Sequence, residues 1–305
     1  MKTYLDCFPC FLRQALEAAR MAGADEKQQR MILDRTMAVL RDVPLESTPP
    51  EIGNQVHRIV RQFTGDNDPY AAVKAESTKE ALRLYPRLRA LAAEDGDRLE
   101  RAVRIAIAGN VIDFTPGTDF DIEETLESVL YQPFAINDMA AFGKVLSGAR
   151  SVLCLGDNAG ETVFDRVLIG ALGVPVTYAV KGGPIINDAT VEDALAAGLD
   201  EVAEVVSTGS DAPGTILSGC SAEFRALYER ADLIIAKGQA NYETLSTGGE
   251  QLFFLLKVKC PVIARDVGAP VGSIVLKRGG CKDDNGAYIH NGSVCPGIAP
   301  YLSPL

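Results

Sequence analysis

The first half of the chain carries apolar residues at the spacing of amphipathic helices. The clearest segment is residues 50–63, whose apolar face is formed by Ile52, Val56, Ile59, Val60 and Phe63. Similar stripes lie in residues 25–41 and 99–108, and a shorter one covers residues 122–130. Apolar positions three and four residues apart indicate helices that bury one face. We therefore predict a helical domain over residues 1–147.

From residue 151 the pattern changes to short apolar runs separated by segments of helix length. The runs cover residues 152–155, 176–180, 202–206 and 233–236, followed by 252–256 together with 262–264. Strands that alternate with helices form a mainly parallel, doubly wound sheet with helices on both faces. The sequence thus predicts an α/β domain over residues 148–280. Residues 281–305 are rich in Gly, Asn, Ser and Pro and are predicted to form a tail, to which we assign no role.

Composition narrows the class of protein. The chain has 305 residues, of which 47% are hydrophobic and 23% charged, which suffices for a substantial buried core. Its formal net charge of -11 argues against a nucleic-acid partner, because binding a phosphate backbone requires a basic surface. No apolar run reaches the roughly 18 residues that a membrane helix needs, and the N-terminus lacks the order of a signal peptide. We expect a soluble, cytoplasmic protein without a membrane partner, and its oligomeric state stays open.

The cysteines do not indicate a disulfide framework. There are seven, and two of them lie in or beside apolar runs, so reduced thiols are expected. Cys7 and Cys10 have the spacing of a redox or metal pair, but two thiols alone do not complete a tetrahedral site. A four-thiol site together with Cys281 and Cys295 stays open on residue count alone.

Polar clusters follow three of the predicted strands. They cover residues 156–161, 181–188 and 237–241, and in a parallel sheet they converge on one edge. The carboxylates of Asp157 and Asp188 and the amide oxygen of Asn158 suit a hard divalent cation such as Mg²⁺ or Mn²⁺. The chain has only two histidines, and neither lies near this edge in sequence, so a histidine-based zinc site is not expected.

Lys237 stands between the fourth predicted strand and an expected helix. Its ammonium group and the free N–H groups of that helix could hold a phosphate together. A cation beside a phosphate clamp indicates phosphoryl transfer to water. Each cluster alone also fits an ordinary helix cap or loop, so the hypothesis rests on their combination. Neither a dinucleotide fingerprint nor a P-loop pattern occurs.

Four ordered motifs, at residues 108–114, 155–161, 181–190 and 237–243, closely resemble those of the DUF89 damage-control phosphatases. The similarity runs from about residue 3 to residue 277, and the Cys7-Phe-Pro-Cys10 segment resembles the cysteine-bearing prokaryotic branch with its ARMT1-like domain. The resemblance implies a helical N-terminal domain packed on a Rossmann-like α/β/α domain. It also implies hydrolysis of phosphate monoesters, such as sugar phosphates or damaged phosphometabolites, with Mn, Mg, Co or Ni as the divalent metal.

The resemblance also implies roles for residues by motif position. Asp157, Asn158 and Asp188 would hold the metal, and Lys237 would contact the phosphate. Asn110 would orient the substrate, and Asp113 would contact its hydroxyl groups or act as an acid or base. We predict four catalytic residues, which are Asp157, Asp188, Lys237 and Asp113. We predict five substrate-binding residues, which are Asn110, Asp113, Lys181, Lys237 and Asn241.

Three of the assigned residues, and also Glu161, have ordinary structural alternatives. Asn110 and Asp113 follow a helix that we expect to stop at Gly109, and polar residues beyond a glycine stop are usually solvated. Lys181 can be a surface charge. Glu161 either positions a water on the metal or complements the dipole at a helix N-terminus.

The leading hypothesis is a divalent-metal phosphatase that acts on a small phosphorylated metabolite. The sequence leaves open whether water attacks phosphorus directly or a phosphoaspartyl intermediate forms on Asp157. The rival is a non-catalytic protein that senses a phosphometabolite or a metal in the same crevice. A methyltransferase is a third alternative, but no glycine-rich loop suits its cofactor.

Overall fold

The computed structural model describes residues 1–94, 96–111, 122–280, 289–290 and 293–294. In this part of the chain a seven-stranded sheet has the order β1-β7-β6-β5-β2-β3-β4. Neighbouring strands are parallel except for the antiparallel pair β6 and β7. The strands are β1 (Phe134–Asn137), β2 (Val152–Leu155), β3 (Val176–Val180), β4 (Glu204–Ser207), β5 (Leu233–Lys237), β6 (Leu252–Lys257) and β7 (Ile274–Arg278). A separate antiparallel pair joins β8 (Ile289–His290) to β9 (Ser293–Val294).

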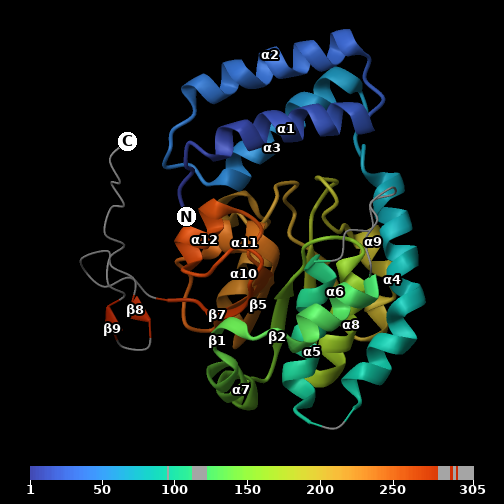
Figure 1. Ribbon diagram of the computed structural model, residues 1–305, viewed down its shortest axis with the longest axis vertical. Coiled ribbons are helices and arrows are strands. Elements are labelled where there is room, and N and C mark those ends of the chain that lie inside the picture. The colour runs from blue at the N-terminus through green and yellow to red at the C-terminus, as the bar shows by residue number, and fades with distance from the viewer. Residues whose placement is uncertain (95, 112–121, 281–288, 291–292, 295–305) are drawn as a thin grey trace.

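The central strands are apolar along their whole length because both faces of the sheet are covered. Every residue of β2 and β5 is buried, as expected for parallel strands between two helix layers. On one face their side chains join a large hydrophobic cluster with α4 (Ala71–Ala92), α5 (Arg98–Val111), α6 (Ile122–Tyr131), α7 (Met139–Gly148), α8 (Glu161–Leu172) and α9 (Val191–Ala196). On the other face a second cluster includes α10 (Ala222–Arg230), α11 (Gly238–Leu245) and α12 (Pro261–Val267). The predicted doubly wound α/β architecture is therefore confirmed (Figure 1).

Two short 3₁₀ turns complete the described elements. They are η1 (Leu199–Glu201), before β4, and η2 (Leu217–Gly219), before α10.

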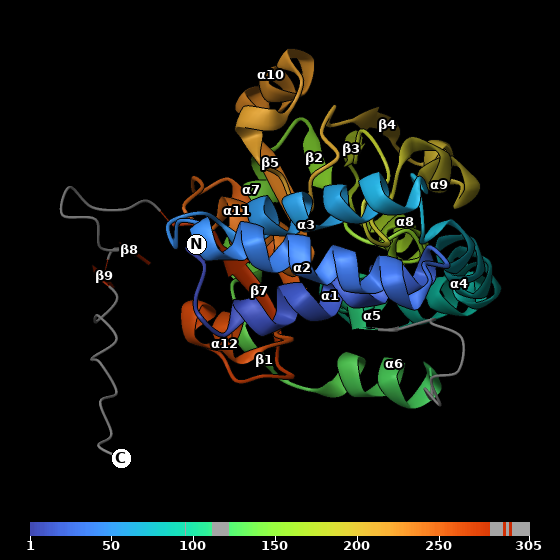
Figure 2. The same cartoon turned by 90° about the horizontal axis from the view of Figure 1, so that it is seen from above.

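The first three helices form a layer of their own. They are α1 (Cys7–Met21), α2 (Glu26–Asp42) and α3 (Pro49–Thr64), and they share a hydrophobic cluster that contains no strand residue. Figures 1 and 2 show this layer lying across one end of the sheet. Two arginines of α3 hold it there: the guanidinium groups of Arg58 and Arg61 pair with Asp211 at 2.9 and 2.7 Å, and Arg61 also donates to the carbonyl oxygen of Pro184 at 2.7 Å.

The hydrophobic clusters divide the chain differently from the boundary expected at residue 147. β1 pairs with β7 in the sheet, and α4 to α7 share the cluster of α8. The segment up to residue 147 is thus not wholly helical, because one edge strand comes from it. A strand of four alternating half-buried and exposed residues carries too short a pattern to be recognised.

Two further local predictions differ from the structure. Residues 262–264 were expected to be a strand but lie in α12, because Pro261 occupies the first turn of that helix, where a missing N–H costs nothing. The helix expected to stop at Gly109 continues to Val111 as α5. A Cβ at Gly109 would lie 2.8 Å from the ring of Phe164, so this glycine allows α5 to approach α8 and does not end the helix.

Among the helices that the structure describes, none combines the length and the apolar character needed to span a bilayer.

Candidate active site

The first two predicted polar clusters meet at the carboxyl ends of neighbouring strands β2 and β3. The carbonyl oxygen of Asp157 accepts a hydrogen bond from the N–H of Ala189 at 2.8 Å, and that of Asn187 accepts one from Ala159 at 2.9 Å. Asn158 and Asp188 form an isolated antiparallel bridge. These bonds bring Asp157, Asn158 and Asp188 together at one edge of the sheet.

The third cluster joins the same edge through Gly238, which follows β5. Gly238 has φ +75°, and a Cβ at this position would lie 1.8 Å from Oδ2 of Asp157. Only a glycine combines this left-handed backbone with such a close approach. The start of α11 therefore lies directly against the Asp157 carboxylate.

Asn110 connects the carboxylates of Asp157 and Glu161. Its Nδ2 donates to Oδ2 of Asp157 and to Oε2 of Glu161, both at 2.8 Å. The amide nitrogen of Asn158 lies 3.4 and 3.3 Å from the same two oxygens. Asn110 is buried within the last turn of α5, so it is neither solvated nor beyond a helix stop. Asp113 lies outside the described residues.

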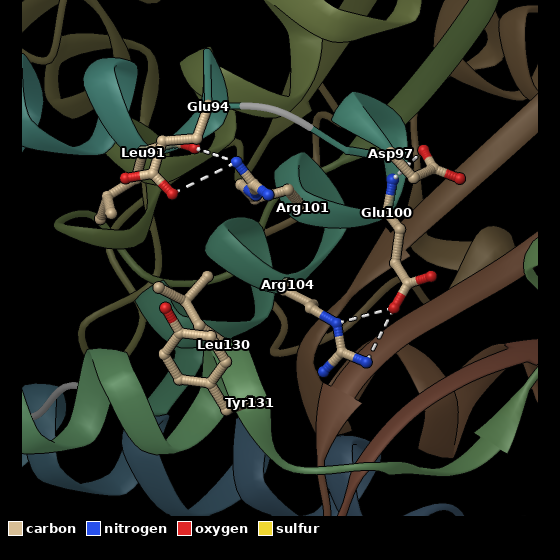
Figure 3. Close-up of a pocket in the computed structure, with 8 residues that line it drawn as sticks. All are labelled: Leu91, Glu94, Asp97, Glu100, Arg101, Arg104, Leu130 and Tyr131. Atoms are coloured by element: carbon tan, nitrogen blue, oxygen red, sulfur yellow. Dashed lines mark hydrogen bonds and ion pairs between the residues drawn. The ribbon is translucent and has the colours of Figure 1, made fainter.

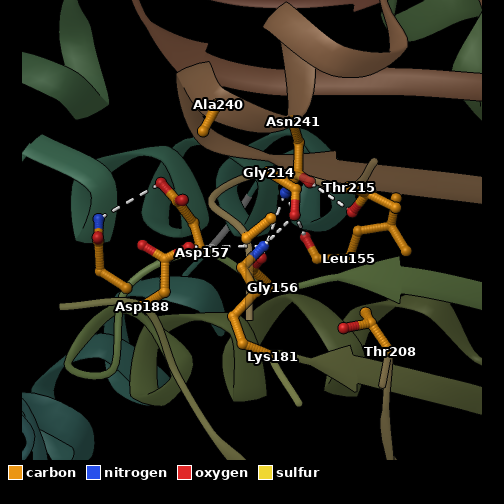
Figure 4. Close-up of polar contacts among 12 residues, drawn as sticks. Leu155, Gly156, Asp157, Lys181, Asp188, Thr208, Gly214, Thr215, Ala240 and Asn241 are labelled. Atoms are coloured by element: carbon orange, nitrogen blue, oxygen red, sulfur yellow. Dashed lines mark hydrogen bonds and ion pairs between the residues drawn. The ribbon is translucent and has the colours of Figure 1, made fainter. Parts of the chain in front are cut away.

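Lys181 lies beside Asp188. Its Nζ is 3.5 Å from Oδ2 of Asp188 and donates to the carbonyl oxygen of Gly214 at 2.5 Å. Lys181 is 3% exposed, so the surface-charge alternative does not describe it. Figure 4 shows Lys181 between the Asp188 carboxylate and the loop that carries Gly214 and Thr215.

Lys237 is fully buried, and its three N–H donors are all engaged. They reach the carbonyl oxygen of Ala106 at 2.9 Å and the carboxylates of Glu161 and Asp165 at 2.5 Å each. Although burial alone lowers it, the two carboxylates hold the pKa of Lys237 well above its ordinary value. The phosphate contact expected of Lys237 would require one of these three acceptors to be exchanged.

Asn241 is also fully buried and braces the strand ends. Its Nδ2 donates to the carbonyl oxygens of Gly156 at 3.2 Å and of Lys237 at 2.7 Å, and its Oδ1 accepts from Thr215 at 2.7 Å. These bonds fix Gly156, directly after β2, and Lys237, the last residue of β5; Figure 4 shows Asn241 beside Gly156.

The electrostatics of the site favour an added cation. The pKa of Asp157 is raised to about 8. Burial is the main cause, and the neighbouring carboxylates of Asp188 and Glu161 act in the same direction. Burial also raises the pKa of Asp188 to about 6, although Lys181 opposes the shift. Two buried oxygens, Oδ1 of Asn110 and Oδ2 of Asp188, accept no hydrogen bond within the described residues. Buried acceptors without donors are costly unless a cation or water meets them.

The donor set fits a hard divalent cation in its chemistry. Within the described part of the chain, no group of three or more His, Cys, Asp or Glu side chains is arranged to hold a metal. The candidate ligands are therefore two carboxylates together with amide oxygens. Oxygen ligands of this kind, with water completing the shell, are typical of Mg²⁺ and Mn²⁺.

A cavity of about 460 Å³ opens onto these residues. Asp157, Asn158 and Asp188 line it together with residues of α1, α3, α11 and α12, so the helical layer forms one wall. Volumes of this size accommodate small metabolites. Cys7 and Cys10 line the same wall, and Cys281 and Cys295 lie outside the described residues.

Four charged residues of the cavity were not predicted as site residues from the sequence, and one of them is Asp6, which directly precedes α1. Arg13 comes from α1, Lys259 precedes α12, and Glu243 lies in α11. Burial raises the pKa of Glu243 to about 7. Glu243 ends the motif at residues 237–243, so a local signal for it existed. Asp6, Arg13 and Lys259 belong to no motif, and their position at the cavity depends on how distant helices pack.

Comparisons with known proteins identify the family and the fold of the chain. Residues 3–275 match the family model described as the damage-control phosphatase ARMT1-like domain. A protein named damage-control phosphatase from Pyrococcus horikoshii is 36% identical over 91% of this chain and 98% of its own length, and one from Archaeoglobus fulgidus is 35% identical over 89% and 97%. A crystal structure of a DUF89 family protein from Pyrococcus horikoshii superposes with a TM-score of 0.85 at 35% identity, covering 92% of this chain and 99% of the other.

Proposed function

The chain belongs to the damage-control phosphatase ARMT1-like family, and we propose that it hydrolyses small phosphorylated metabolites with a divalent cation bound at Asp157 and Asp188. Sugar phosphates and damaged phosphometabolites are the proposed substrate class. The names of the relatives support a phosphatase, and the chemistry of the site supports the cation.

One observation carries the proposal. Two buried carboxylates, Asp157 and Asp188, line a cavity of metabolite size side by side, and the pKa of each is raised, mainly by burial. Asp157, Asn158 and Asp188 would hold the cation, and the unpartnered Oδ1 of Asn110 is a further oxygen at the site. When bound, such a cation would neutralise negative charge on the phosphoryl group and would lower the pKa of a coordinated water.

The surrounding residues orient these carboxylates. Asn110 fixes one oxygen of Asp157 through its amide, and Lys181 lies against Asp188. Lys237 pairs with Glu161 and Asp165 below them. We assign positioning roles to Lys237 and Asn241, because their donors already serve protein acceptors, and to Lys181, because it is buried between Asp188 and the carbonyl oxygen of Gly214.

Two cations of the cavity wall are the proposed direct contacts of the phosphate. Lys259 and Arg13 are exposed and line the cavity that Asp157 lines. Lys259 is also close enough to Asp157 for its charge to act against the rise in the pKa of that carboxyl group. A flexible ammonium and a guanidinium can neutralise phosphate oxygens as substrate enters. The predicted contact of Asp113 with substrate hydroxyl groups rests on its motif.

Release of inorganic phosphate tests the proposal. We expect purified protein to hydrolyse p-nitrophenyl phosphate and members of a sugar phosphate panel when Mn²⁺, Co²⁺, Ni²⁺ or Mg²⁺ is added, and to stop when chelator is in excess. Asp157→Asn should abolish turnover while the circular dichroism spectrum is unchanged. Asp34→Asn, on the exposed surface of α2, serves as the matched control and should retain full activity.

The opposite result identifies the rival function. Tight binding of a phosphometabolite with no phosphate release across the panel, under all four metals, would replace the phosphatase by a sensor.

A further inference from the structure

A second cavity, of about 530 Å³, lies at the far end of α8 from the active site. It is lined by the C-terminal part of α4, the start of α5, residues 166–170 of α8, and residues 201–202. None of its lining residues lines the active-site cavity. We call it the arginine pocket, after Arg89, Arg98 and Arg166.

Arg166 forms the buried part of the arginine pocket. It is 7% exposed, and its guanidinium group lies 4.2 Å from the centre of the Tyr85 ring. One Nη donates to the carbonyl oxygen of Ala197 at 2.8 Å and the other pairs with Glu201. Its Nε has no hydrogen-bond partner within the described residues. A buried N–H on a charged group without an acceptor is unfavourable, so an acceptor supplied by a ligand would satisfy it.

The other two arginines stand exposed at the rim. Arg89 lies 5.9 Å from the centre of the same Tyr85 ring, and Arg98 donates to the carbonyl oxygen of Gly170 at 3.3 Å. Neither has a carboxylate partner among the described residues. Most of their donors are therefore free to meet a ligand.

The charge of the arginine pocket is opposite to that of the whole chain. Among its described lining residues, three arginines face one acid, Glu201, whose side chain is 68% exposed. The chain carries a formal net charge of -11. Gathering three guanidinium groups around one cavity costs repulsion that a bound anion would offset.

In a neighbouring cavity, by contrast, the arginines are paired with carboxylates. It has about 330 Å³ and is lined by Arg101 and Arg104 among others. Arg101 pairs with Glu94 at 3.4 Å, and Arg104 pairs with Glu100 at 2.8 Å (Figure 3). Its guanidinium groups are thus balanced by carboxylates, whereas Arg89 and Arg98 are not.

We propose that the arginine pocket is a binding site for a small phosphate-type oxyanion, separate from the active site. Planar guanidinium groups, here those of Arg89 and Arg98, donate paired hydrogen bonds to phosphate oxygens. The unpartnered Nε of the buried Arg166 is a further donor for the same anion. The cavity has room for a phosphorylated metabolite as well as for inorganic phosphate.

Calorimetric titration with inorganic phosphate, in chelator, tests the arginine pocket. The variant is Arg89→Gln/Arg98→Gln, because both side chains are exposed and their loss leaves the contacts of Arg166 intact. Phosphate that binds at the active site is common to both proteins, so their difference reports the pocket. We expect the variant to lose one binding event, or to bind at least about tenfold more weakly. Arg83→Gln, an exposed residue of α4 that pairs with Glu80, is the matched control and should bind like the wild type.

Equal phosphate binding by the wild type and the double variant would overturn the proposal, as would a wild type that binds no phosphate. Parallel titrations with glucose 6-phosphate and with glucose identify the source of the oxyanion. Tighter binding of the sugar phosphate than of phosphate, lost in the double variant, assigns the pocket to a phosphorylated metabolite. Equal binding of both assigns it to the phosphate group alone.

Discussion

Gly238 lies so close to Asp157 that a side chain at this position would overlap the carboxylate. The distance from an added Cβ to Oδ2 of Asp157 would be 1.8 Å, and the backbone of Gly238 has φ +75°. Two effects therefore act on any substitution here: steric overlap with a proposed metal ligand and strain of a left-handed backbone.

Gly238→Ala is expected to lose activity at least about 100-fold, because it displaces Asp157 or the start of α11. The measurements are phosphate release and the midpoint of thermal unfolding. Gly268→Ala separates the two effects, since Gly268 has φ +81° and nothing lies within 4 Å of its added Cβ. That control should lose only the roughly 1 kcal/mol of backbone strain and keep its activity. Equal losses in both variants would show that backbone strain alone matters.

Lys237→Met is expected to destabilise the fold strongly. The substitution leaves the buried carboxylates of Glu161 and Asp165 without a cation, and breaking a buried ion pair in this way costs about 3–5 kcal/mol. Urea unfolding followed by circular dichroism measures the loss. Adding Asp165→Asn should restore part of the stability because one uncompensated charge is removed.

Lys259→Met is the matched comparison for Lys237→Met. Lys259 is exposed, so the free energy of unfolding should change by less than about 0.5 kcal/mol. Its effect should instead be a raised KM for phosphorylated substrates. A variant at Lys237 that unfolds like the wild type would contradict the positioning role that we assign to it.

Metal binding should be visible in stability without any turnover. A ligand that binds only the native state raises its stability by mass action, so Mn²⁺ should raise the unfolding midpoint of the wild type. Asp157→Asn should abolish this increase. In chelator the same variant should be at least as stable as the wild type, because it removes one of several crowded buried carboxyl groups. A midpoint of Asp157→Asn that still rises with Mn²⁺ would place the metal elsewhere.

His57 should make stability depend on pH between about 4 and 6.5. His57 is a buried residue of α3. Burial lowers the pKa of His57 to about 4, and the positive charge of Arg61 acts in the same direction. The unfolded chain binds this proton at higher pH than the folded protein. The contribution of neutral His57 is therefore complete above about pH 6.5 and is lost as pH falls toward 4, by about 3 kcal/mol in total.

His57→Phe tests this contribution, because it keeps a ring against Tyr70, whose centre lies 6.3 Å away, and removes the titrating group. The difference in unfolding free energy between variant and wild type should grow in favour of the variant as pH falls. A difference that is constant from pH 7 to pH 4 would show that His57 does not titrate in this range.

The fold was predictable to the extent that it depends on local patterns. The strands at 152–155 and 176–180 were predicted with their observed bounds, because buried parallel strands are continuous apolar runs. The edge strand β1 and its neighbour β7 were not predicted. β1 is half exposed, and β7 comes after the helix α12, whose apolar residues resembled a strand.

The candidate site, too, was predictable where it depends on local patterns and not where it depends on distant residues. The convergence of Asp157, Asn158 and Asp188 follows from the rule that loops after parallel strands share one edge. Gly109 shows where that reasoning fails: glycine ends many helices, but here it admits the Phe164 ring between two helices. The choice between these roles depends on a residue 55 positions away, which no local rule includes.

By itself, the sequence determined which residues are apolar, with what period, and which polar residues follow each strand, because these depend on neighbours in the chain. The tertiary structure alone decided that Lys237 is enclosed by two carboxylates, that α1 and α3 wall the cavity, and that three arginines meet at the end of α8. The physical reason is that burial and charge compensation depend on long-range packing. A side chain's environment is set by the elements packed against it, and these come from distant parts of the chain.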